Sequence, residues 1–273
     1  VNSDLLQLTG DPADVAIDTV TYTVGPGVQG GRVTHDDDSD PSNGLLLSVD
    51  FENLEPVQDN AAASNLIVNA TGAVNAINYT AGPGGGIFIG ATGLVSIDGF
   101  ETIEFNNKDN LTINAGAGSD TINLNYQNAA QLAPTGNTFA LLQNVNVNAG
   151  DPAGGRDTLV FNGLTSMASE NIRLNATALG SGEIQKPTNS MPDVNYTGVE
   201  DVGIVQQRSQ GDFFAVDGTA AGDEHFQVSA GDSAGQYRVV GTMDQTGATA
   251  AGPFALPTID VLGDAGFGIF NFF

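Results

Sequence analysis

The feature that most restricts the fold of this chain is a series of short segments in which apolar and polar residues alternate. Each segment runs for roughly four to seven residues and closes at Gly, Asn or Asp. A period of two places successive side chains on opposite faces of an extended strand. The pattern therefore predicts many short strands, at DTVTYTV (18–24), NLIVNA (65–70), NLTINA (110–115), DTINLNY (120–126), NVNVNA (144–149), DTLVFNG (157–163), NIRLNA (171–176), HFQVSA (225–230) and QYRVVG (236–241).

Helix signals are nearly absent from the chain. It has 36 Gly and 11 Pro, whereas Lys and Arg together number only 7. Gly and Pro disfavour helix interiors, and Lys and Arg are among the better helix formers. The best helix candidate is a single turn within LTSMASENI (164–172). We therefore expect an all-β protein.

The chain also resembles itself at irregular intervals. An apolar residue followed by Glu or Gln recurs at Phe51, Phe100, Leu142 and Val199, and Asp-Thr-apolar recurs at 18–20, 120–122 and 157–159. Repeats of this kind favour a parallel β-solenoid, or β-helix, with irregular turns, in which each repeat covers the apolar edge of the next. A β-sandwich is the alternative, since short strands and turns also occur there. We expect one elongated repeat domain over 1–273, with weak internal seams near 163–170 and 206–212.

The charge of the chain restricts its partners. There are 32 acidic residues and 7 basic ones, a formal net charge of −25. This charge repels nucleic acid and anionic membrane surfaces. It attracts cations, and calcium prefers oxygen ligands such as carboxylates. The same charge also keeps proteins soluble. There are no cysteines, which excludes disulfides and thiolate metal sites.

One glycine-rich turn points to a specific cation. The run 115–123, AGAGSDTIN, resembles the repeats-in-toxin nonapeptide Gly-Gly-x-Gly-x-Asp-x-U-x, with Ala115 in place of the first Gly. In that family, glycine carbonyls and Asp carboxylates of adjacent turns share a calcium ion. The resemblance implies that Gly116, Gly118 and Asp120 contribute to a calcium site. The other interpretation is that Gly-x-Asp is ordinary turn chemistry.

A second, stretched copy of this turn lies at NAGDPAGGRDTLVF (148–161). It keeps Gly-x-Asp-x-apolar at 155–159, with Asp157 as the aspartate, and has an apparent insertion of Asp151, Pro152 and Ala153. Both aspartates are therefore further candidates for calcium ligands. The two copies are not back to back as in the repeats-in-toxin family. The predicted turns therefore depart from the arrangement in which adjacent turns of that family share a calcium ion.

The densest acidic segment, THDDDSDPSNG (34–44), is an independent cation candidate. Asp36, Asp38 and Asp40 alternate as in the first half of an EF-hand loop, but Pro41 and Leu47 stand where that loop needs Gly and Glu. An EF-hand is therefore rejected. Crowded carboxylates repel one another, and a divalent cation relieves the repulsion. A solvated hairpin tip is the alternative.

Signals for catalysis are weak. The chain has two histidines and lacks the HExxH, GxSxG and P-loop patterns. The basic residues are scattered, and there is no Trp to stack on sugars. We therefore expect no enzyme. A carbohydrate-active β-helix enzyme or a sugar-binding domain is the alternative.

The chain as a whole resembles the Gly/Asn/Asp-rich repeat modules of large bacterial extracellular and surface proteins, through segments such as NYTGVEDV and NAGAGSDTI. This resemblance implies a non-enzymatic structural or adhesive module, of the self-assembling, filament or surface-layer type, whose folding or assembly Ca²⁺ supports. The expected partners are further copies, neighbouring surface modules or polysaccharide. The apolar terminal segment FGIFNFF (267–273) is expected to form the last strand.

Overall fold

The structure is a computed structural model of the 273-residue chain. It describes residues 4–10, 17–37, 44–54, 56–125, 142–150, 155–163, 171–185, 193–205, 213–217, 225–230, 236–243, 254–255, 258–262 and 269–272. The described part of the chain contains strands and turns and no helix. The prediction of an all-β protein is therefore confirmed.

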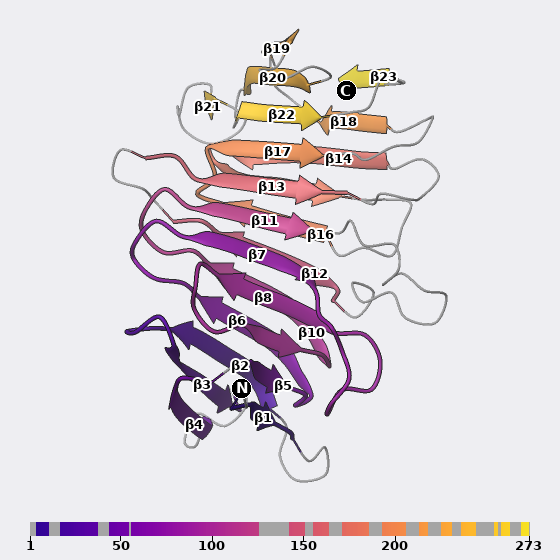
Figure 1. The fold of residues 1–273 in the computed structure, drawn as a ribbon. Helices are drawn as coiled ribbons and strands as arrows, with labels where there is room; N and C mark the ends of the chain where they lie inside the picture. The colour runs from indigo at the N-terminus through magenta and orange to yellow at the C-terminus, as the bar shows by residue number, and fades with distance from the viewer. Residues whose placement is uncertain are drawn as a thin grey trace.

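The strands form two sheets, which we call sheet A and sheet B (Figure 1). Sheet A runs in the order β1-β5-β9-β8-β7-β11-β13-β17-β22-β20-β19, and β21 pairs with β20. Its strands are β1 (Leu6–Leu8), β5 (Val57–Asp59), β7 (Ala76–Ala81), β8 (Gly93–Ile97), β9 (Ile103–Phe105), β11 (Thr121–Asn125), β13 (Thr158–Asn162), β17 (Asp201–Val205), β19 (His225–Ala230), β20 (Gln236–Met243), β21 (Phe254–Ala255) and β22 (Thr258–Leu262).

Sheet B runs in the order β23-β18-β14-β15-β16-β12-β10-β6-β2-β3-β4. Its strands are β2 (Ile17–Val24), β3 (Gly30–Asp36), β4 (Leu45–Glu52), β6 (Ala63–Asn69), β10 (Lys108–Asn114), β12 (Asn144–Asn148), β14 (Asn171–Ala178), β15 (Ser181–Gln185), β16 (Asp193–Thr197), β18 (Phe213–Asp217) and β23 (Ile269–Phe272). The expected last strand within 267–273 is thus present as β23.

The chain crosses repeatedly from one sheet to the other. From β9 onward it passes from sheet A to β10 in sheet B, back to β11, and on through β12 and β13. Strands from successive crossings pair in parallel, as β7-β11-β13-β17-β22 in sheet A and β2-β6-β10-β12-β16 in sheet B. Antiparallel strands interrupt this path at β8 and at β15, and they also form the β3-β4 end of sheet B and the β19-β20-β21 end of sheet A. We call one passage through both sheets a coil.

The core lies along the inner faces of both sheets, as one cluster of buried apolar side chains. Because the parallel strands are in register, inward residues of successive coils lie over one another. In sheet A, Ile77 pairs with Ile122 and Ile122 with Leu159, all 0% exposed. In sheet B, Leu66 pairs with Leu111 in the same way. Each coil therefore covers the apolar edge that the previous coil leaves open.

The outer faces carry ladders of hydrogen-bonded amides. In sheet B the Nδ2 of Asn114 donates to Oδ1 of Asn69 at 2.7 Å, and the Nδ2 of Asn148 donates to Oδ1 of Asn114 at 2.8 Å. A parallel row joins Asn65, Asn110 and Asn144. Stacked Asn side chains of this kind add cross-strand bonds to a parallel in-register sheet. This is the physical role of many of the Asn residues in the alternating segments.

The strand predictions are confirmed, whereas the alignment of the apolar-Glu copies is wrong. The Asp-Thr-apolar copies at 120–122 and 157–159 do align, since Thr121 pairs with Thr158 and Ile122 with Leu159. All nine predicted segments contain a strand. Sheet B, however, pairs Asn65, Asn110, Asn144 and Asp193 at separations of 45, 34 and 49 residues. The apolar-Glu copies do not define this register. Aligning Phe51 with Phe100 sets Leu54 opposite Ile103, three residues further on, but the sheet pairs Ile103 with Val57. Residues 164–170 of the helix candidate and the seam at 206–212 lie outside the described residues.

Candidate functional site

A row of carboxylates lies where the chain enters successive strands of sheet A. Asp120, Asp157 and Glu200 immediately precede β11, β13 and β17. Each accepts a backbone N–H from the coil before it: Asn75 N–H to Asp120 Oδ1 at 2.7 Å, Asp120 N–H to Asp157 Oδ1 at 2.7 Å, and Asp157 N–H to Glu200 Oε2 at 2.6 Å. We call these three residues the carboxylate ladder. It extends the hydrogen bonding of sheet A by one residue at each turn.

Asp120 has an oxygen that this ladder does not use. Its side chain is 0% exposed, and Oδ2 is buried without a hydrogen-bond partner. Burial raises the pKa of the Asp120 carboxyl, and the charge of Asp98 raises it further, while the hydrogen bond from Asn75 acts in the opposite direction. A buried carboxylate with one donor and a like charge nearby gains from a bound cation, because the cation supplies the missing partner.

Glu104 shows how the fold stabilises a buried carboxylate without an ion. It is also 0% exposed, but its oxygens accept hydrogen bonds from Thr92 Oγ1 at 2.6 Å, Gly84 N–H at 2.7 Å and Gln58 Nε2 at 3.0 Å. Three donors offset the loss of hydration for this group. The two buried carboxylates therefore differ in the number of donors that reach them, three for Glu104 and one for Asp120.

The glycines predicted as calcium ligands lie in the turn before β11, and their conformation has a structural cause. Gly116 has φ of 99° and Gly118 has φ of 128°, a region open almost only to glycine. A Cβ on Gly118 would lie 2.7 Å from the carbonyl oxygen of Ala73 in the preceding coil. A Cβ on Gly116 would overlap the carbonyl oxygen of Thr71, and one on Gly150 would overlap that of Gly116. The glycines allow neighbouring turns to stack in contact.

The other predicted ligands are only partly described. Asp36 ends β3 and accepts a hydrogen bond from Thr34 Oγ1 at 3.0 Å. Asp38 and Asp40 lie outside the described residues, as does Asp151. Within the described ranges, no group of three or more His, Asp or Glu side chains is arranged to hold a metal ion. Any ion at Asp120 would therefore take most of its ligands from backbone carbonyls and water.

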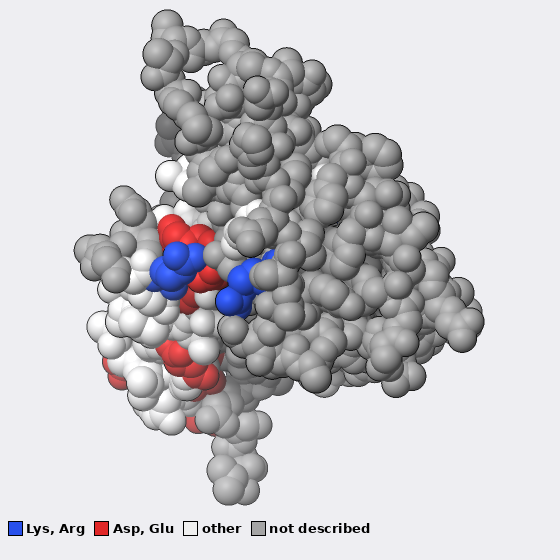
Figure 2. All heavy atoms as spheres, turned by 90° about the horizontal axis from the view of Figure 1, so that it is seen from above, with Lys and Arg blue, Asp and Glu red and all other residues white. Residues whose placement is uncertain are grey.

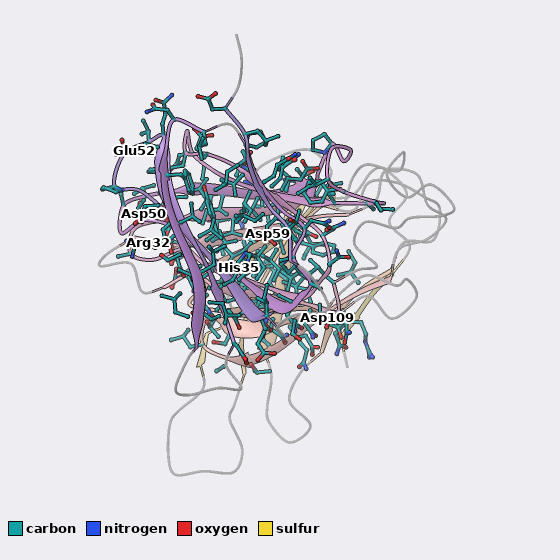
Figure 3. The ribbon with its side chains drawn as sticks, turned by 90° about the horizontal axis from the view of Figure 1, so that it is seen from below. Arg32, His35, Asp50, Glu52, Asp59 and Asp109 are labelled. Atoms are coloured by element: carbon teal, nitrogen blue, oxygen red, sulfur yellow. The ribbon has the colours of Figure 1, made fainter. Side chains whose placement is uncertain are left out.

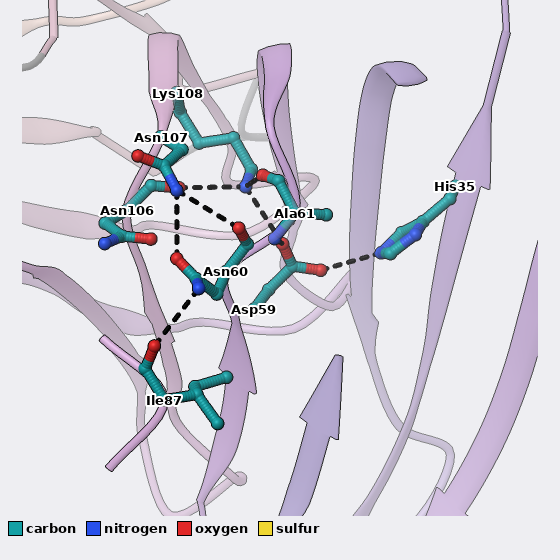
Figure 4. A network of polar contacts seen from close by, with 8 residues as sticks. All are labelled: His35, Asp59, Asn60, Ala61, Ile87, Asn106, Asn107 and Lys108. Atoms are coloured by element: carbon teal, nitrogen blue, oxygen red, sulfur yellow. Dashed lines mark hydrogen bonds and ion pairs between the residues drawn. The ribbon is translucent and has the colours of Figure 1, made fainter. Parts of the chain in front are cut away.

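Sequence reasoning missed a buried charge network between the sheets (Figure 4). Asp59 Oδ2 lies 2.7 Å from Nε2 of His35, and Asp59 Oδ1 lies 2.9 Å from Nζ of Lys108. His35 is 4% exposed and Lys108 3%. Figure 3 places His35 and Asp59 toward the middle of the molecule and Arg32, Asp50 and Glu52 at its periphery. The sequence carries no signal for this network, because Lys108 stands beside Asp109 in an Asn-rich segment and its small register partner, Ala63, is set by the fold.

Two further ion pairs of the described residues lie at the surface, with side chains that are 29–69% exposed. Arg32 pairs with Asp50 at 2.6 Å and Arg156 with Asp201 at 2.7 Å. Figure 2 likewise shows coloured basic side chains lying beside acidic ones rather than forming a separate basic patch. Exposed pairs of this kind contribute about 0 to 1 kcal/mol each.

Comparison with known proteins identifies no relative. No family model, no curated protein and no solved structure matches the chain. Among the described residues there is also no helix long and apolar enough to cross a membrane.

Proposed function

We propose that this chain is a non-enzymatic structural module of the cell exterior, whose two sheets are the faces of a parallel β-solenoid that calcium stabilises. The observation that carries the proposal is the buried, unpartnered Oδ2 of Asp120 within a turn that repeats from coil to coil. A repeated turn with stacked glycines and carboxylates is a scaffold rather than a cleft. The strongly acidic composition agrees with this.

The solenoid interpretation is favoured by the strand pairing. Parallel in-register strands join successive coils in both sheets, and the chain alternates between the sheets. A β-sandwich is built mainly from antiparallel strands joined by hairpins and Greek-key connections. In this chain the antiparallel strands are either inserted into the parallel path, as β8 and β15 are, or lie at an end of a sheet, as β3-β4 and β19-β20-β21 do.

Calcium is the favoured ion because the available ligands are oxygens. Carboxylate, backbone carbonyl and water form its usual coordination shell, and extracellular calcium modules bind with Kd of about 10⁻⁴–10⁻³ M. A site with few carboxylates fits the weak end of this range. At about 10 mM calcium, binding to the folded state alone adds roughly 1.4–2.7 kcal/mol. For a domain of this size that corresponds to a rise in Tm of about 3–10 °C.

Thermal unfolding in calcium and in chelator tests the proposal. We expect the Tm of the protein to rise with millimolar Ca²⁺ and to return when the ion is chelated. Asp120→Asn, which keeps an acceptor for the Asn75 N–H, should abolish the response. Asp109→Asn, at an exposed aspartate, is the matched control and should keep it. If calcium does not change the Tm of the unchanged protein, the calcium proposal is wrong. If Asp120→Asn keeps the full calcium response, the ion binds somewhere other than Asp120, for example at Asp36–Asp40.

Association with further copies or neighbouring modules is the second part of the proposal. Among the described residues β4 is the last strand of sheet B, and its Leu45 is 57% exposed. An open strand edge with exposed apolar residues promotes strand addition. Sedimentation velocity at increasing concentration should show oligomers that Leu45→Lys reduces. A protein that sediments as a monomer throughout, with and without calcium, would contradict self-association.

A further inference from the structure

The amino group of Lys108 and the carboxyl of Asp59 are held against each other in a dry part of the core. Nζ lies 2.9 Å from Oδ1, and both side chains are 0% exposed. Lys108 begins β10 in sheet B and Asp59 ends β5 in sheet A. The contact therefore bridges the two sheets, and it joins residues that are 49 positions apart in the chain.

The surroundings orient the amine toward the carboxyl. Nζ also donates to the carbonyl oxygen of Ala61 at 2.5 Å and to that of Asn106 at 3.0 Å. These two carbonyls come from the segments that flank Asp59 and Lys108, so the position of Nζ is set by backbone on both sides (Figure 4). Fixed contact of two reacting groups is the main requirement for an intramolecular condensation.

The two oxygens of Asp59 have different partners, and the difference has chemical meaning. Oδ1 accepts the backbone N–H of Ala61 at 3.1 Å, so a negative charge that develops on this oxygen is already met by a donor. Oδ2 lies 2.7 Å from Nε2 of His35, a group able to give and take a proton. One oxygen is thus placed to carry charge and the other to leave as water.

We propose that Lys108 and Asp59 condense to an intramolecular isopeptide bond. A proton first passes from the ammonium to the carboxylate, where it resides on Oδ2. The neutral Nζ then attacks Cγ, the C–N bond forms, and Oδ1 takes the negative charge. His35 carries a proton from the nitrogen to Oδ2, the C–Oδ2 bond breaks and water leaves. The net change is ammonium plus carboxylate to amide plus water, which needs no oxidant or other reactant.

Burial favours this reaction in two ways. It lowers the pKa of Lys108, although the charge of Asp59 opposes the change, and a lower pKa makes the neutral amine more accessible. Burial alone would raise the pKa of Asp59, but Lys108 and His35 outweigh it and hold the pKa low, so the ion pair is the starting state. Exclusion of bulk water also protects the product amide. In a chain with no cysteine the bond would supply the covalent tie that disulfides give elsewhere.

Intact-mass spectrometry of the folded, full chain tests the proposal directly. We expect a mass one water below that of the sequence, and Lys108→Arg should restore the full sequence mass. Trypsin reports the site, because no Lys or Arg lies between 33 and 107 or between 109 and 155. An unmodified chain gives the separate peptides 33–108 and 109–156. The modified chain gives a single peptide 33–156, because trypsin does not cleave at an acylated lysine.

The outcomes separate the covalent bond from an ordinary buried ion pair. A mass equal to that of the sequence overturns the proposal, as does a missing water that persists in Lys108→Arg, since it then arises elsewhere. The role of His35 has its own readout: His35→Gln, refolded from denaturant, should form the product at least tenfold more slowly by intact mass. An unchanged rate would remove His35 from the reaction.

Discussion

The stacked glycine turn gives the sharpest test of how this fold is held together, through Gly118→Ala. The φ of Gly118 is 128°, and an added Cβ would lie 2.7 Å from Ala73 O and 2.8 Å from Val74 N. Forcing alanine into such a backbone conformation costs about 1–3 kcal/mol. Relieving the overlap with backbone adds about 1–3 kcal/mol. We therefore expect the free energy of unfolding to fall by roughly 2–6 kcal/mol, out of a total of about 5–15.

Gly72→Ala is the matched control for this change. Gly72 belongs to the corresponding turn of the preceding coil, yet a Cβ there meets nothing within 4 Å. Its replacement should shift stability by no more than about 1 kcal/mol, through the unfolded chain. Urea unfolding followed by circular dichroism measures both variants, with m-values expected to stay unchanged.

The same assay separates packing from ion binding. A turn that served only to present calcium ligands would lose stability in calcium, through displacement of the carbonyl at position 118, but not in chelator. Stacking predicts the same loss in both conditions. Equal stability of Gly118→Ala and Gly72→Ala, within about 1 kcal/mol, would refute the reasoning from the turn geometry.

Three further outcomes follow from the described contacts. Asn114→Ala removes one bond to Asn69 and one from Asn148, so chemical denaturation should show a loss of about 1–2 kcal/mol; no loss would mean that the amide ladder adds nothing to stability. Asp201→Asn breaks only an exposed pair, so the same measurement should change by less than about 1 kcal/mol, and a larger loss would contradict surface exposure of that pair. In chelator, ionised Asp120 destabilises the fold, because the pKa of its carboxyl is higher in the folded state than in the unfolded state. The free energy of unfolding should therefore rise as pH falls through the raised pKa toward the unfolded value. Asp120→Asn should remove this rise from the stability–pH curve, and a curve identical to that of the unchanged protein would contradict the argument.

The sequence was sufficient for the strands but not for the register between them. Alternating segments such as NLTINA already show which side chains share a face of a strand, and β10 forms there. The alignment failed because apolar-Glu motifs recur for different reasons in different places: Phe51 lies on a strand of the inserted hairpin, whereas Val199 precedes a strand of sheet A. The register between two strands depends on which coils are neighbours in the fold. Insertions of unequal length between the strands determine this.

The buried charges were the least predictable part of the candidate sites. Lys108 and Asp109 are adjacent charged residues in a segment rich in Asn, which is typical of an exposed turn. Lys108 is instead buried, because the strand register sets it beside Ala63 and within reach of Asp59. Asp120 was predicted from its motif, but its single hydrogen-bond donor depends on the preceding coil and only the fold reveals it.

The amide ladders have a direction along the molecule. Among the described residues, each ladder bond between Asn side chains has its nitrogen in the later coil and its oxygen in the earlier one, from Asn110 on Asn65 to Asn195 on Asn146. Each folded coil therefore presents free acceptors on the side where the next coil arrives. A chain synthesised from its N-terminus brings the matching donors in the order in which they are needed. The coil that folded last therefore determines where the next coil of the chain binds.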